Sequence, residues 1–383
     1  MSALATAMLS QGDEVTGADR NLNTPNIRFL ESLGIKCFPD DGSGIDDQTD
    51  EVVVSTAIEQ TNKGIAKAQD MGIEIVHRAR ALAQTLSGYR LVAVVGTCGK
   101  STVTAMLGHI LSECGMDPMC VNGANVTGWT GAVREGDGVY AVAEVDESDK
   151  SLVAFHPYAA VVTNSSSDHY SKEEMDEVFD AFVKDVKGPV IDGRKDMGEM
   201  ATSAIGKHNR NNAYLAYKMA VALGCDEAQA RAALMSFKGV ERRLQKHGNR
   251  VYDDYAHNPE KLKAMWQTVK EEHPGKGICV CWRPHGYGPL RKMLEALSKM
   301  FNETIGAEDQ LLILPVYDAG GTAKRDVNAE DLARLVKGAI TVKDHDEAFE
   351  WMASHEFGAY VTCGARDPEL PELARRIANA KRT

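Results

Sequence analysis

The chain has 383 residues, of which 43% are hydrophobic and 26% are charged, a balance typical of globular proteins. Its formal net charge of −12 argues against a general binder of nucleic acid or of anionic membranes. No apolar run approaches the roughly 18 residues that a membrane span needs, so no transmembrane helix is predicted. The eight cysteines show no CxxC spacing, which favours reduced thiols in a cytoplasmic protein over a zinc site or a disulfide framework.

Residues 1–88 alternate between helical and strand patterns and predict an N-terminal Rossmann-like domain. Helices are expected at 1–11, 25–33, 62–71 and 78–86, and strands at 14–18, 35–38, 51–55 and 74–76. The pattern starts on a helix, so we expect the first strand of such a domain and its glycine turn to be absent. Asp19 ends the first expected strand, where it could contact a ribose hydroxyl or equally well cap a turn.

A short glycine loop opens the next region, residues 89–245. Leu91–Val95 predicts a buried parallel strand, Gly96-Thr97-Cys98-Gly99-Lys100-Ser101 follows at once, and a helical apolar pattern comes next. Backbone N–H groups in such a loop can surround phosphate oxygens, Lys100 can reach the β- and γ-phosphates, and Ser101 can bind Mg²⁺. Only two residues separate the glycines, which points to fewer families than the common phosphate-binding loop. The alternative is a glycine-rich turn with a chance lysine.

The remainder continues the α/β alternation. In the central region we expect strands at 119–123, 139–145 and 159–163, helices at 173–186, 208–223 and 226–237, and an irregular segment at 187–205. In residues 246–383 we expect strands at 250–255, 277–282, 310–316, 339–342 and 359–363, and helices at 259–271, 289–301, 329–336, 348–355 and 371–380. Ligand sites in such sheets lie beyond the carboxyl ends of the strands. The residues that fall there in the last region are Asp254, His257, His285, Tyr317 and Gly364.

Six segments in order resemble the motifs of the Mur ligase family: GTCGKST, AEVDESDKS, VVTNSSSDH, GKHNRNN, GVERR and DDYAHNP. The resemblance covers essentially the whole chain. Within the family, the DESD and DDYxHxP segments are most similar to the group that adds alanine to UDP-N-acetylmuramate.

The resemblance implies a three-domain α/β fold: a Rossmann-like UDP-sugar domain at 1–88, a P-loop ATP-binding domain at 89–245, and an α/β domain at 246–383 that binds the amino acid and closes on ATP. It implies an ADP-forming ligase of peptidoglycan precursor synthesis, with ATP and Mg²⁺ as cofactors. The carboxylate of a UDP-sugar or other acid becomes an acyl phosphate, which the amine of an amino acid attacks. These small molecules are the expected partners, with no nucleic acid or membrane, and the chain is expected to be a monomer or homodimer. The alternatives are a different acid acceptor and a non-catalytic, nucleotide-binding paralogue.

The resemblance also implies residue roles. The nucleotide site would comprise Gly96, Thr97, Gly99, Lys100, Ser101, Thr102, His208, Asn209, Asn212 and Arg243. Metal ligands would be Ser101, Glu147 and His169, and catalytic residues would be Lys100, His169, Arg243, Asp254 and His257. Substrate contacts would come from Asp19, His285, Arg291 and Tyr317.

Several of these assignments have alternatives. Arg242 could take the place of Arg243, and Asn209, His169 and His257 could each cap a helix. Two departures from the family pattern stand out: Cys98 replaces a histidine, and Gly286 replaces the first arginine of a PHRxxR loop. We expect Arg291 to hold the carboxylate of the amino acid, although a solvated helix arginine fits the sequence equally well.

Overall fold

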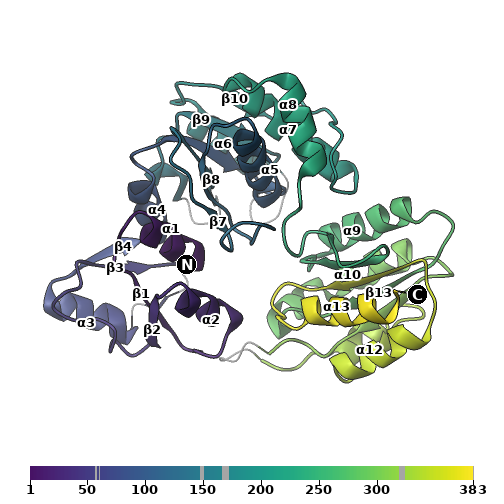
Figure 1. Ribbon diagram of the computed structural model, residues 1–383. Coiled ribbons are helices and arrows are strands. Elements are labelled where there is room, and N and C mark those ends of the chain that lie inside the picture. Colours follow the sequence, from purple (N-terminus) through teal and green to yellow (C-terminus); the bar gives the residue numbers. More distant parts are fainter. Residues whose placement is uncertain (57, 60, 147–150, 166–171, 319–323, 383) are drawn as a thin grey trace. The chain divides into compact units, whose positions relative to one another are not determined.

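The computed structural model describes residues 1–56, 58–59, 61–146, 151–165, 172–318 and 324–382. The chain divides into two compact units (Figure 1). The first unit comprises residues 1–204 and 208–240, and the second comprises residues 205–207 and 241–383. Within the described ranges, no helix is both long and apolar enough to span a bilayer.

The first unit is built around a six-stranded sheet with the order β10-β9-β5-β8-β6-β7. Its strands are β5 Arg90–Val95, β6 Met119–Val121, β7 Val133–Arg134, β8 Tyr140–Glu144, β9 Ala159–Val162 and β10 Val190–Asp192. All neighbouring pairs are parallel except β6 and β7. The chain leaves β5 through α5 and reaches β6 on one side of it, and the connection from β8 to β9 crosses to the other side. The strand order therefore reverses at β5, and an open α/β sheet places its ligand at the carboxyl end of such a point.

Helices cover both faces of this sheet, which explains the continuous apolar run in β5. Val92 and Val94 pack in one core with α5 (Lys100–Glu113), α7 (Lys207–Ala222) and α8 (Glu227–Ser236). The alternate residues of β5 pack in the opposite core. That core contains α1 Ser2–Ser10, α4 Arg78–Thr85, the 3₁₀ turn η1 Ser151–Ala154 and α6 Lys172–Val183.

The N-terminal strands form two separate two-stranded parallel sheets, β1 with β2 and β3 with β4. Their bounds are β1 Thr16–Asp19, β2 Lys36–Pro39, β3 Glu51–Val54 and β4 Glu74–His77, and the helices among them are α2 Pro25–Ser32 and α3 Lys63–Met71. Helices α1 and α4 contribute Leu4 and Leu82 to a core of the central sheet, and Leu86, which follows α4, packs in the same core. Residues 1–88 accordingly belong to the first unit. A division of the chain into three domains stays a prediction.

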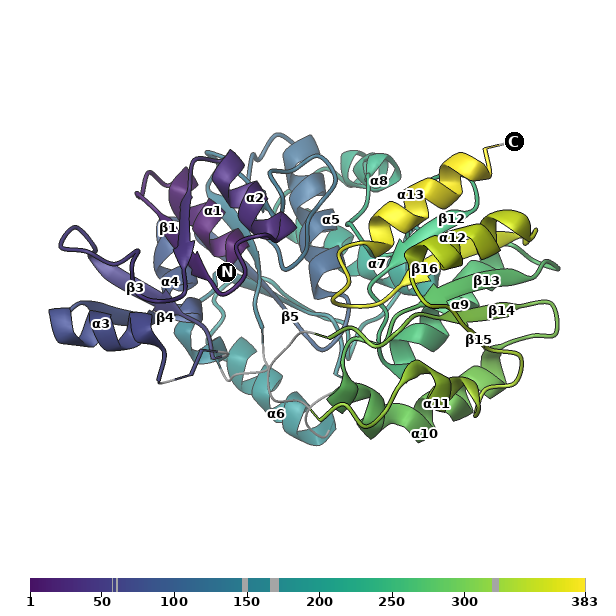
Figure 2. The ribbon, with the colours of Figure 1, turned by 90° about the horizontal axis from the view of Figure 1, so that it is seen from below.

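The second unit also contains a six-stranded sheet, with the order β11-β12-β16-β13-β14-β15 (Figure 2). Its strands are β11 Gln245–Lys246, β12 Val251–Asp254, β13 Ile278–Trp282, β14 Gln310–Ile313, β15 Ile340–Thr341 and β16 Ala359–Cys363. Every neighbouring pair is parallel except β11 and β12.

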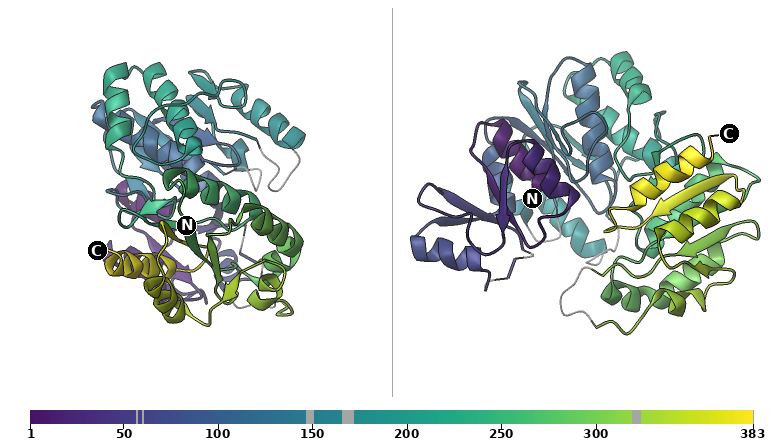
Figure 3. Two further views of the ribbon diagram at one scale, coloured as in Figure 1. Left: turned by 90° about the vertical axis from the view of Figure 1, so that its right-hand side faces the viewer. Right: turned by 60° about the horizontal axis from the view of Figure 1, so that its bottom comes forward.

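Two layers of helices enclose this second sheet. On one face lie α9 Pro259–Glu272, α10 Tyr287–Thr304 and α11 Ala329–Ala333, and on the other lie α12 His345–Ser354 and α13 Leu370–Ala380. Both views of Figure 3 show α12 and α13, in yellow-green and yellow, together on their face. Strand β13 alternates between the layers, with Val280 in the α9–α10 core and Cys279 and Cys281 in the α12–α13 core, as their spacing predicts.

Candidate active site

The loop after β5 requires both of its glycines. Gly96 and Gly99 have φ angles of 128° and 86°, a region that favours glycine. A Cβ at Gly96 would lie 2.1 Å from Thr163 Oγ1, and one at Gly99 would lie 2.5 Å from Asn212 Oδ1. The loop is therefore closely enclosed by the end of β9 and by α7, and no other residue type fits at either position.

Asn164, which follows β9, fastens the middle of this loop. Its Oδ1 accepts hydrogen bonds from Thr97 Oγ1 at 2.7 Å and from the Cys98 N–H at 3.1 Å. Its Nδ2 donates to the Cys98 carbonyl at 2.9 Å, and Thr163 Oγ1 donates to the same carbonyl at 2.6 Å. These bonds hold the loop in one shape before any ligand arrives, which lowers the entropic cost of binding.

The first turn of α5 carries the polar groups expected to contact phosphate. Lys100 Nζ donates to the Gly96 carbonyl at 2.6 Å, so the ammonium group lies over the loop itself. Ser101 and Thr102 are buried at the helix start, where the helix dipole favours anions. The arrangement suits a phosphate group: backbone donors, one positive charge and a hydroxyl converge at one helix terminus.

Helix α7 brings two asparagines of the sequence motif to this loop. Asn209 and Asn212 are 4% and 8% exposed, and Asn212 Nδ2 lies 3.5 Å from Asn209 Oδ1. Asn212 also contacts Gly99, so its side chain supports the glycine loop. His208 is at the exposed start of the same helix.

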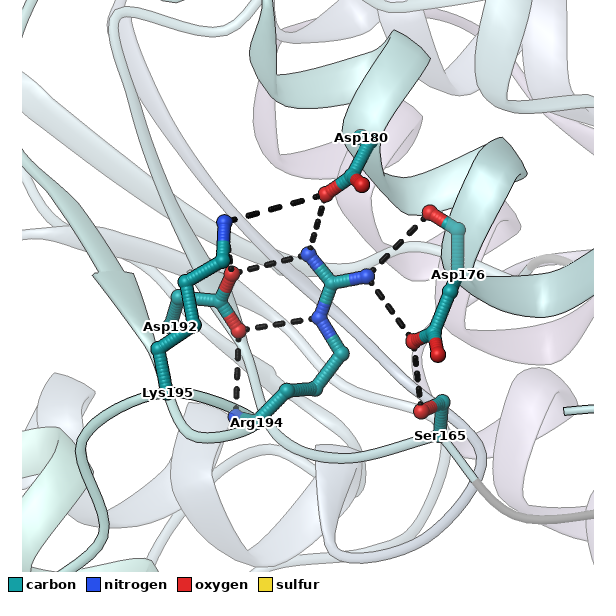
Figure 4. Close-up of polar contacts among 6 residues, drawn as sticks. All are labelled: Ser165, Asp176, Asp180, Asp192, Arg194 and Lys195. Atoms are coloured by element: carbon teal, nitrogen blue, oxygen red, sulfur yellow. Dashed lines mark hydrogen bonds and ion pairs between the residues drawn. The ribbon is translucent and has the colours of Figure 1, made fainter. Parts of the chain in front are cut away.

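An arginine-centred network fixes the segment next to Asn164 (Figure 4). The Arg194 side chain, only 9% exposed, donates to Asp192 at 2.8 and 2.9 Å, to Asp180 at 2.7 Å and to Asp176 at 3.0 Å. Asp176 in turn accepts from the Ser165 hydroxyl at 2.7 Å. The three carboxylates raise the pKa of Arg194 further above its already high ordinary value. The network ties α6 and the end of β10 to the residue that follows Asn164.

At the start of the second unit, Arg242 serves the fold. Its Nε donates to Asp253 Oδ2 at 2.9 Å, and its Nη2 donates to the Gly364 carbonyl at 2.6 Å. Asp253 is fully buried and also accepts from Thr362 Oγ1 at 2.9 Å. The guanidinium carbons of Arg242 and Arg243 both lie over the Tyr255 ring, 5.5 and 5.2 Å from its centre, but Arg243 makes no hydrogen bond or ion pair within the described residues. Of the two arginines that the sequence left open, Arg243 is therefore the better candidate for a ligand contact.

Asp254 and His257 lie at the carboxyl end of β12. Asp254 accepts backbone N–H bonds from Leu244 at 2.8 Å and from Ala256 at 2.7 Å, and burial raises its pKa although Arg243 opposes this. His257 Nδ1 lies 3.0 Å from the Tyr255 carbonyl. Because a carbonyl only accepts, Nδ1 carries the proton, and the lone pair of a neutral ring is on Nε2.

The His285 ring packs against His257, with ring centres 4.9 Å apart. Burial lowers the pKa of His285 to about 4, with further lowering by His257, Arg366 and Lys261, so the ring is neutral at pH 7. The expectation that Asp254, His257 and His285 gather at this edge of the sheet is therefore consistent with the structure.

Comparison with known proteins agrees with this arrangement. Residues 1–90 match the model of the Mur ligase family, catalytic domain, and residues 240–366 match the model of the Mur ligase, glutamate ligase domain. The UDP-N-acetylmuramate–L-alanine ligase of Rubrobacter xylanophilus is 32% identical over 438 residues, which cover 100% of this chain and 93% of that protein. The chain belongs to the Mur ligase family. Members of this family are ATP-dependent, ADP-forming ligases.

Two other relatives extend the comparison. The enzyme of the same name from Gloeobacter violaceus is 29% identical over 438 residues, covering 98% of this chain and 93% of that protein. The crystal structure of the UDP-N-acetylmuramate–alanine ligase of Thermotoga maritima superimposes with a TM-score of 0.81 at 24% identity, covering 100% and 96% of the two chains. This superposition shows that the present chain has the Mur ligase fold.

Of the three metal ligands expected from the Mur ligase motifs, Ser101 is described above, and Glu147 and His169 lie outside the described residues. The described neighbour Asp146 lies 3.8 Å from Arg78, and Glu144 accepts the Gly123 N–H at 2.8 Å. No group of three potential metal-binding side chains occurs within the described ranges. The metal site thus stays a prediction.

The expected substrate residues are placed as follows. Asp19 Oδ1 accepts the Asn21 N–H at 2.9 Å, which is the turn-capping alternative. Arg291 donates to Asp326 and, at 2.7 Å, to the Lys324 carbonyl, so its guanidinium is engaged on the surface of α10. The centre of the Tyr317 ring lies 5.2 Å from the guanidinium carbon of Arg283, and the backbone N–H of Tyr317 donates to the Pro284 carbonyl at 2.8 Å.

Sequence reasoning missed Asn164, Arg194 and Arg283 as residues that shape this Mur ligase site. Asn164 had a usable signal, because it is the first residue after the strand expected at 159–163, which neighbours β5. Arg283 occupies the equivalent position after β13. Arg194 lay in a segment expected to be irregular, and nothing local marked its three carboxylate partners.

Proposed function

We propose that this chain is a UDP-N-acetylmuramate–L-alanine ligase-like enzyme of peptidoglycan precursor synthesis. The observation that carries the proposal is that the chain is similar, along essentially its full length, to relatives of that name. Their name indicates which acid and which amino acid we propose as substrates. ATP, with Mg²⁺, provides the phosphoryl group that activates the acid as an acyl phosphate. A cytoplasmic location forms part of the proposal, because ATP is consumed.

The first unit would hold the nucleotide. The glycine loop, fixed by Asn164 and too tight for any Cβ, offers backbone donors to the phosphates. Lys100 would move from the Gly96 carbonyl to the β- and γ-phosphates, and Ser101 would bind Mg²⁺. Phosphoryl transfer depends mainly on such positioning and charge neutralisation. Thr97, Thr102, His208, Asn209 and Asn212 complete the proposed nucleotide site, and Glu147 and His169 its metal site.

The second unit would supply groups to the acceptor reaction. We assign the proton transfer to His257, whose Nε2 lone pair can accept a proton from the ammonium group of the amino acid. Asp254 orders the loop that carries Arg243, through its bond to the Leu244 N–H. Arg243 would neutralise charge on the transferred phosphoryl group.

The test is phosphate release from ATP and Mg²⁺ in the presence of UDP-N-acetylmuramate and a panel of amino acids, with each component omitted in turn. We expect release to require the acid, one amino acid and Mg²⁺, and removal of the metal by a chelator to stop it. Lys100→Ala should lower the rate about 10²- to 10³-fold, as loss of one charge-stabilising donor commonly does. Lys299→Ala, an exposed lysine of α10, is the control.

A ligase that uses a different acid acceptor is the second candidate. Residues 193–206, between β10 and α7, contain no helix or strand, in keeping with the irregular segment that the sequence predicts at 187–205. The same assay with other carboxylate-bearing nucleotide sugars distinguishes the two. A protein that binds ATP yet releases phosphate with none of these acids would instead be the non-catalytic paralogue.

A further inference from the structure

A short loop after β16 presents an arginine at the carboxyl edge of the second sheet. The loop leaves the sheet beside β13, because the Arg283 N–H donates to the Cys363 carbonyl at 3.0 Å. Its first residue, Gly364, has a φ of 150° and lies so close to Arg283 that a Cβ would be 2.8 Å from the Arg283 carbonyl oxygen. Gly364 also donates to the Asp254 carbonyl at 3.2 Å. The loop therefore starts next to residues of the proposed acceptor site.

Both sides of Arg366 are held in place. On one side, Arg242 binds the Gly364 carbonyl at 2.6 Å. On the other, the Asp367 carboxylate is 1% exposed and accepts from Arg283 at 2.8 Å and from His345 at 2.7 Å. These partners, with burial acting against them, lower the pKa of Asp367 to about 2, so it stays ionised and paired. Arg366 sits between two anchored residues and is itself exposed.

Three other arginines of this edge are already occupied, and Arg243, which lies over the Tyr255 ring, is the one proposed to contact the phosphoryl group. Arg242 is bound to Asp253 and Gly364, and Arg283 to Asp367 and the Pro315 carbonyl. Arg291 is bound to Asp326 and to the Lys324 carbonyl. Arg366, in contrast, makes no hydrogen bond or ion pair with any residue in the described ranges. Its planar group of donors is therefore available to a ligand.

The surroundings of Arg366 favour an anion. The positive charges of Arg366 and Lys261 both act on the half-buried His285 ring, which remains uncharged at neutral pH. His285 in turn contacts His257, the proposed proton acceptor for the amine. An α-amino acid carries its carboxylate and its amine on one carbon, so its two ends need a cationic group and a proton acceptor close together.

We propose that Arg366 binds the carboxylate of the incoming amino acid, in the role that the sequence suggested for Arg291. The inference rests on the proposed function and names the amino-acid contact of that same site. A guanidinium and a carboxylate form two parallel charge-assisted hydrogen bonds, which fix the orientation of the ligand as well as its charge. The loop anchored by Arg242 and Arg283 supplies the rigidity that such a contact needs.

The experiment compares L-alanine with L-alaninamide, which lacks the carboxylate, in wild type and in Arg366→Ala. We expect Arg366→Ala to raise the KM for the amino acid about 10- to 100-fold, as loss of a charged hydrogen bond does, and to leave the KM for ATP unchanged. Wild type should prefer L-alanine over the amide, and in Arg366→Ala this preference should be smaller by the same factor. Arg366→Lys should recover part of both effects, and Arg375→Ala, an exposed arginine of α13 paired with Glu372, should change neither.

Binding separates this inference from the proposed function. Saturation-transfer NMR with the full chain, Mg²⁺, a non-hydrolysable ATP analogue and the same amino-acid panel detects the contact even where no phosphate is released. Binding of an amino acid to wild type but not to Arg366→Ala supports the proposal. The proposal is overturned if wild type and Arg366→Ala bind the amino acid equally, or if neither binds it. It is also overturned if Arg291→Ala loses binding and Arg366→Ala does not.

Discussion

At the scale of single residues, Gly99 shows how closely the loop and α7 fit. Its φ of 86° and the 2.5 Å separation between a Cβ and Asn212 Oδ1 both oppose a side chain. We expect Gly99→Ala to destabilise the first unit by about 1–3 kcal/mol and to weaken binding of an ATP analogue at least tenfold, because the loop must move away from its bonds with Asn164.

Urea unfolding and calorimetric titration measure the two effects. Gly88→Ala is the matched control, since a Cβ there meets nothing within 4 Å and the backbone is not left-handed. A Gly99→Ala protein that binds the nucleotide as tightly as wild type would show that the loop does not form the phosphate site.

Asp253 makes the stability of the second unit depend on pH. Burial raises its pKa to about 6, although Arg242 and the Thr362 hydroxyl lower it. The unfolded carboxyl has a pKa of about 3.9, so between these values the native state binds more protons than the unfolded state. The protonated Asp253 carboxyl therefore contributes about 3 kcal/mol to the free energy of unfolding below about pH 4, and this contribution is lost as the pH rises through about 6.

Asp253→Asn should remove this dependence, because an amide does not titrate. Denaturant unfolding at several pH values between 4 and 7 gives, for each protein, the slope of the free energy of unfolding against pH. The stability difference between wild type and Asp253→Asn should change with pH in that window, and Asp254, whose pKa burial also raises, is present in both proteins. A constant difference would mean that Asp253 is ionised throughout.

Sequence patterns predicted those residues of the candidate site that lie close together in the chain. Gly96, Gly99 and Lys100 follow one another between a strand and a helix, and their type and spacing alone indicate phosphate binding. The choice between Arg242 and Arg243 could not be made in this way, because it depends on the buried Asp253. The same limit applies to Arg291, whose partner Asp326 lies 35 residues further along the chain.

At the scale of elements, the Arg194 network joins α6 to the ends of β9 and β10. Replacing the nearly buried guanidinium with an apolar group of similar length would leave Asp192, whose side chain is 11% exposed, with only the exposed Lys195 as a charged partner. We expect Arg194→Met to destabilise the first unit by about 3–5 kcal/mol, as removal of one member of a buried pair does. Arg210→Ala, which breaks an exposed pair with Glu199, should cost about 1 kcal/mol or less.

Acid should abolish the difference in stability between Arg194→Met and wild type. Burial alone would raise the pKa of Asp192, but the hydrogen bonds from Arg194 outweigh burial and lower this pKa. Hydrogen bonds from Ser165 and Arg194 likewise lower the pKa of Asp176. The stabilisation is therefore present above the unfolded pKa of about 3.9 and is lost as the pH falls below it. Urea midpoints at pH 7 and pH 3 measure this. If the difference in stability between the two proteins is as large at pH 3 as at pH 7, the destabilisation by Arg194→Met is due to lost packing and not to lost charge pairing.

The longer elements could be predicted from sequence, and of the shortest strands β6 and β15 were predicted but three others were not. Helices such as α5 and α13 repeat an apolar face over several turns, and β5 and β13 are continuous apolar runs. Strands β7, β10 and β11 have only two or three residues, too few for any period, and long-range pairing alone creates them. Glu173–Val186, expected as one helix, ends at Val183 in α6.

At the scale of the whole molecule, each unit has its own pair of hydrophobic cores around its own sheet. Units with separate cores unfold as separate cooperative blocks when the contacts between them are weaker than those within them. We therefore expect two transitions in calorimetry. The tryptophans distinguish them, because Trp129 belongs to the first unit and the other three belong to the second.

A non-hydrolysable ATP analogue with Mg²⁺ should move these transitions apart. At a concentration of 100 times its Kd, it adds about 2.7 kcal/mol to the unit that binds it, or about 5–10 °C for a unit of this size. The calorimetric transition of the first unit should move by this amount, while the tryptophan signal, dominated by the buried Trp266 and Trp282, should move less. Lys100→Ala should abolish the shift without merging the transitions. A single transition that moves as a whole with the nucleotide would mean that the two units unfold together, and that the site stabilises the entire chain.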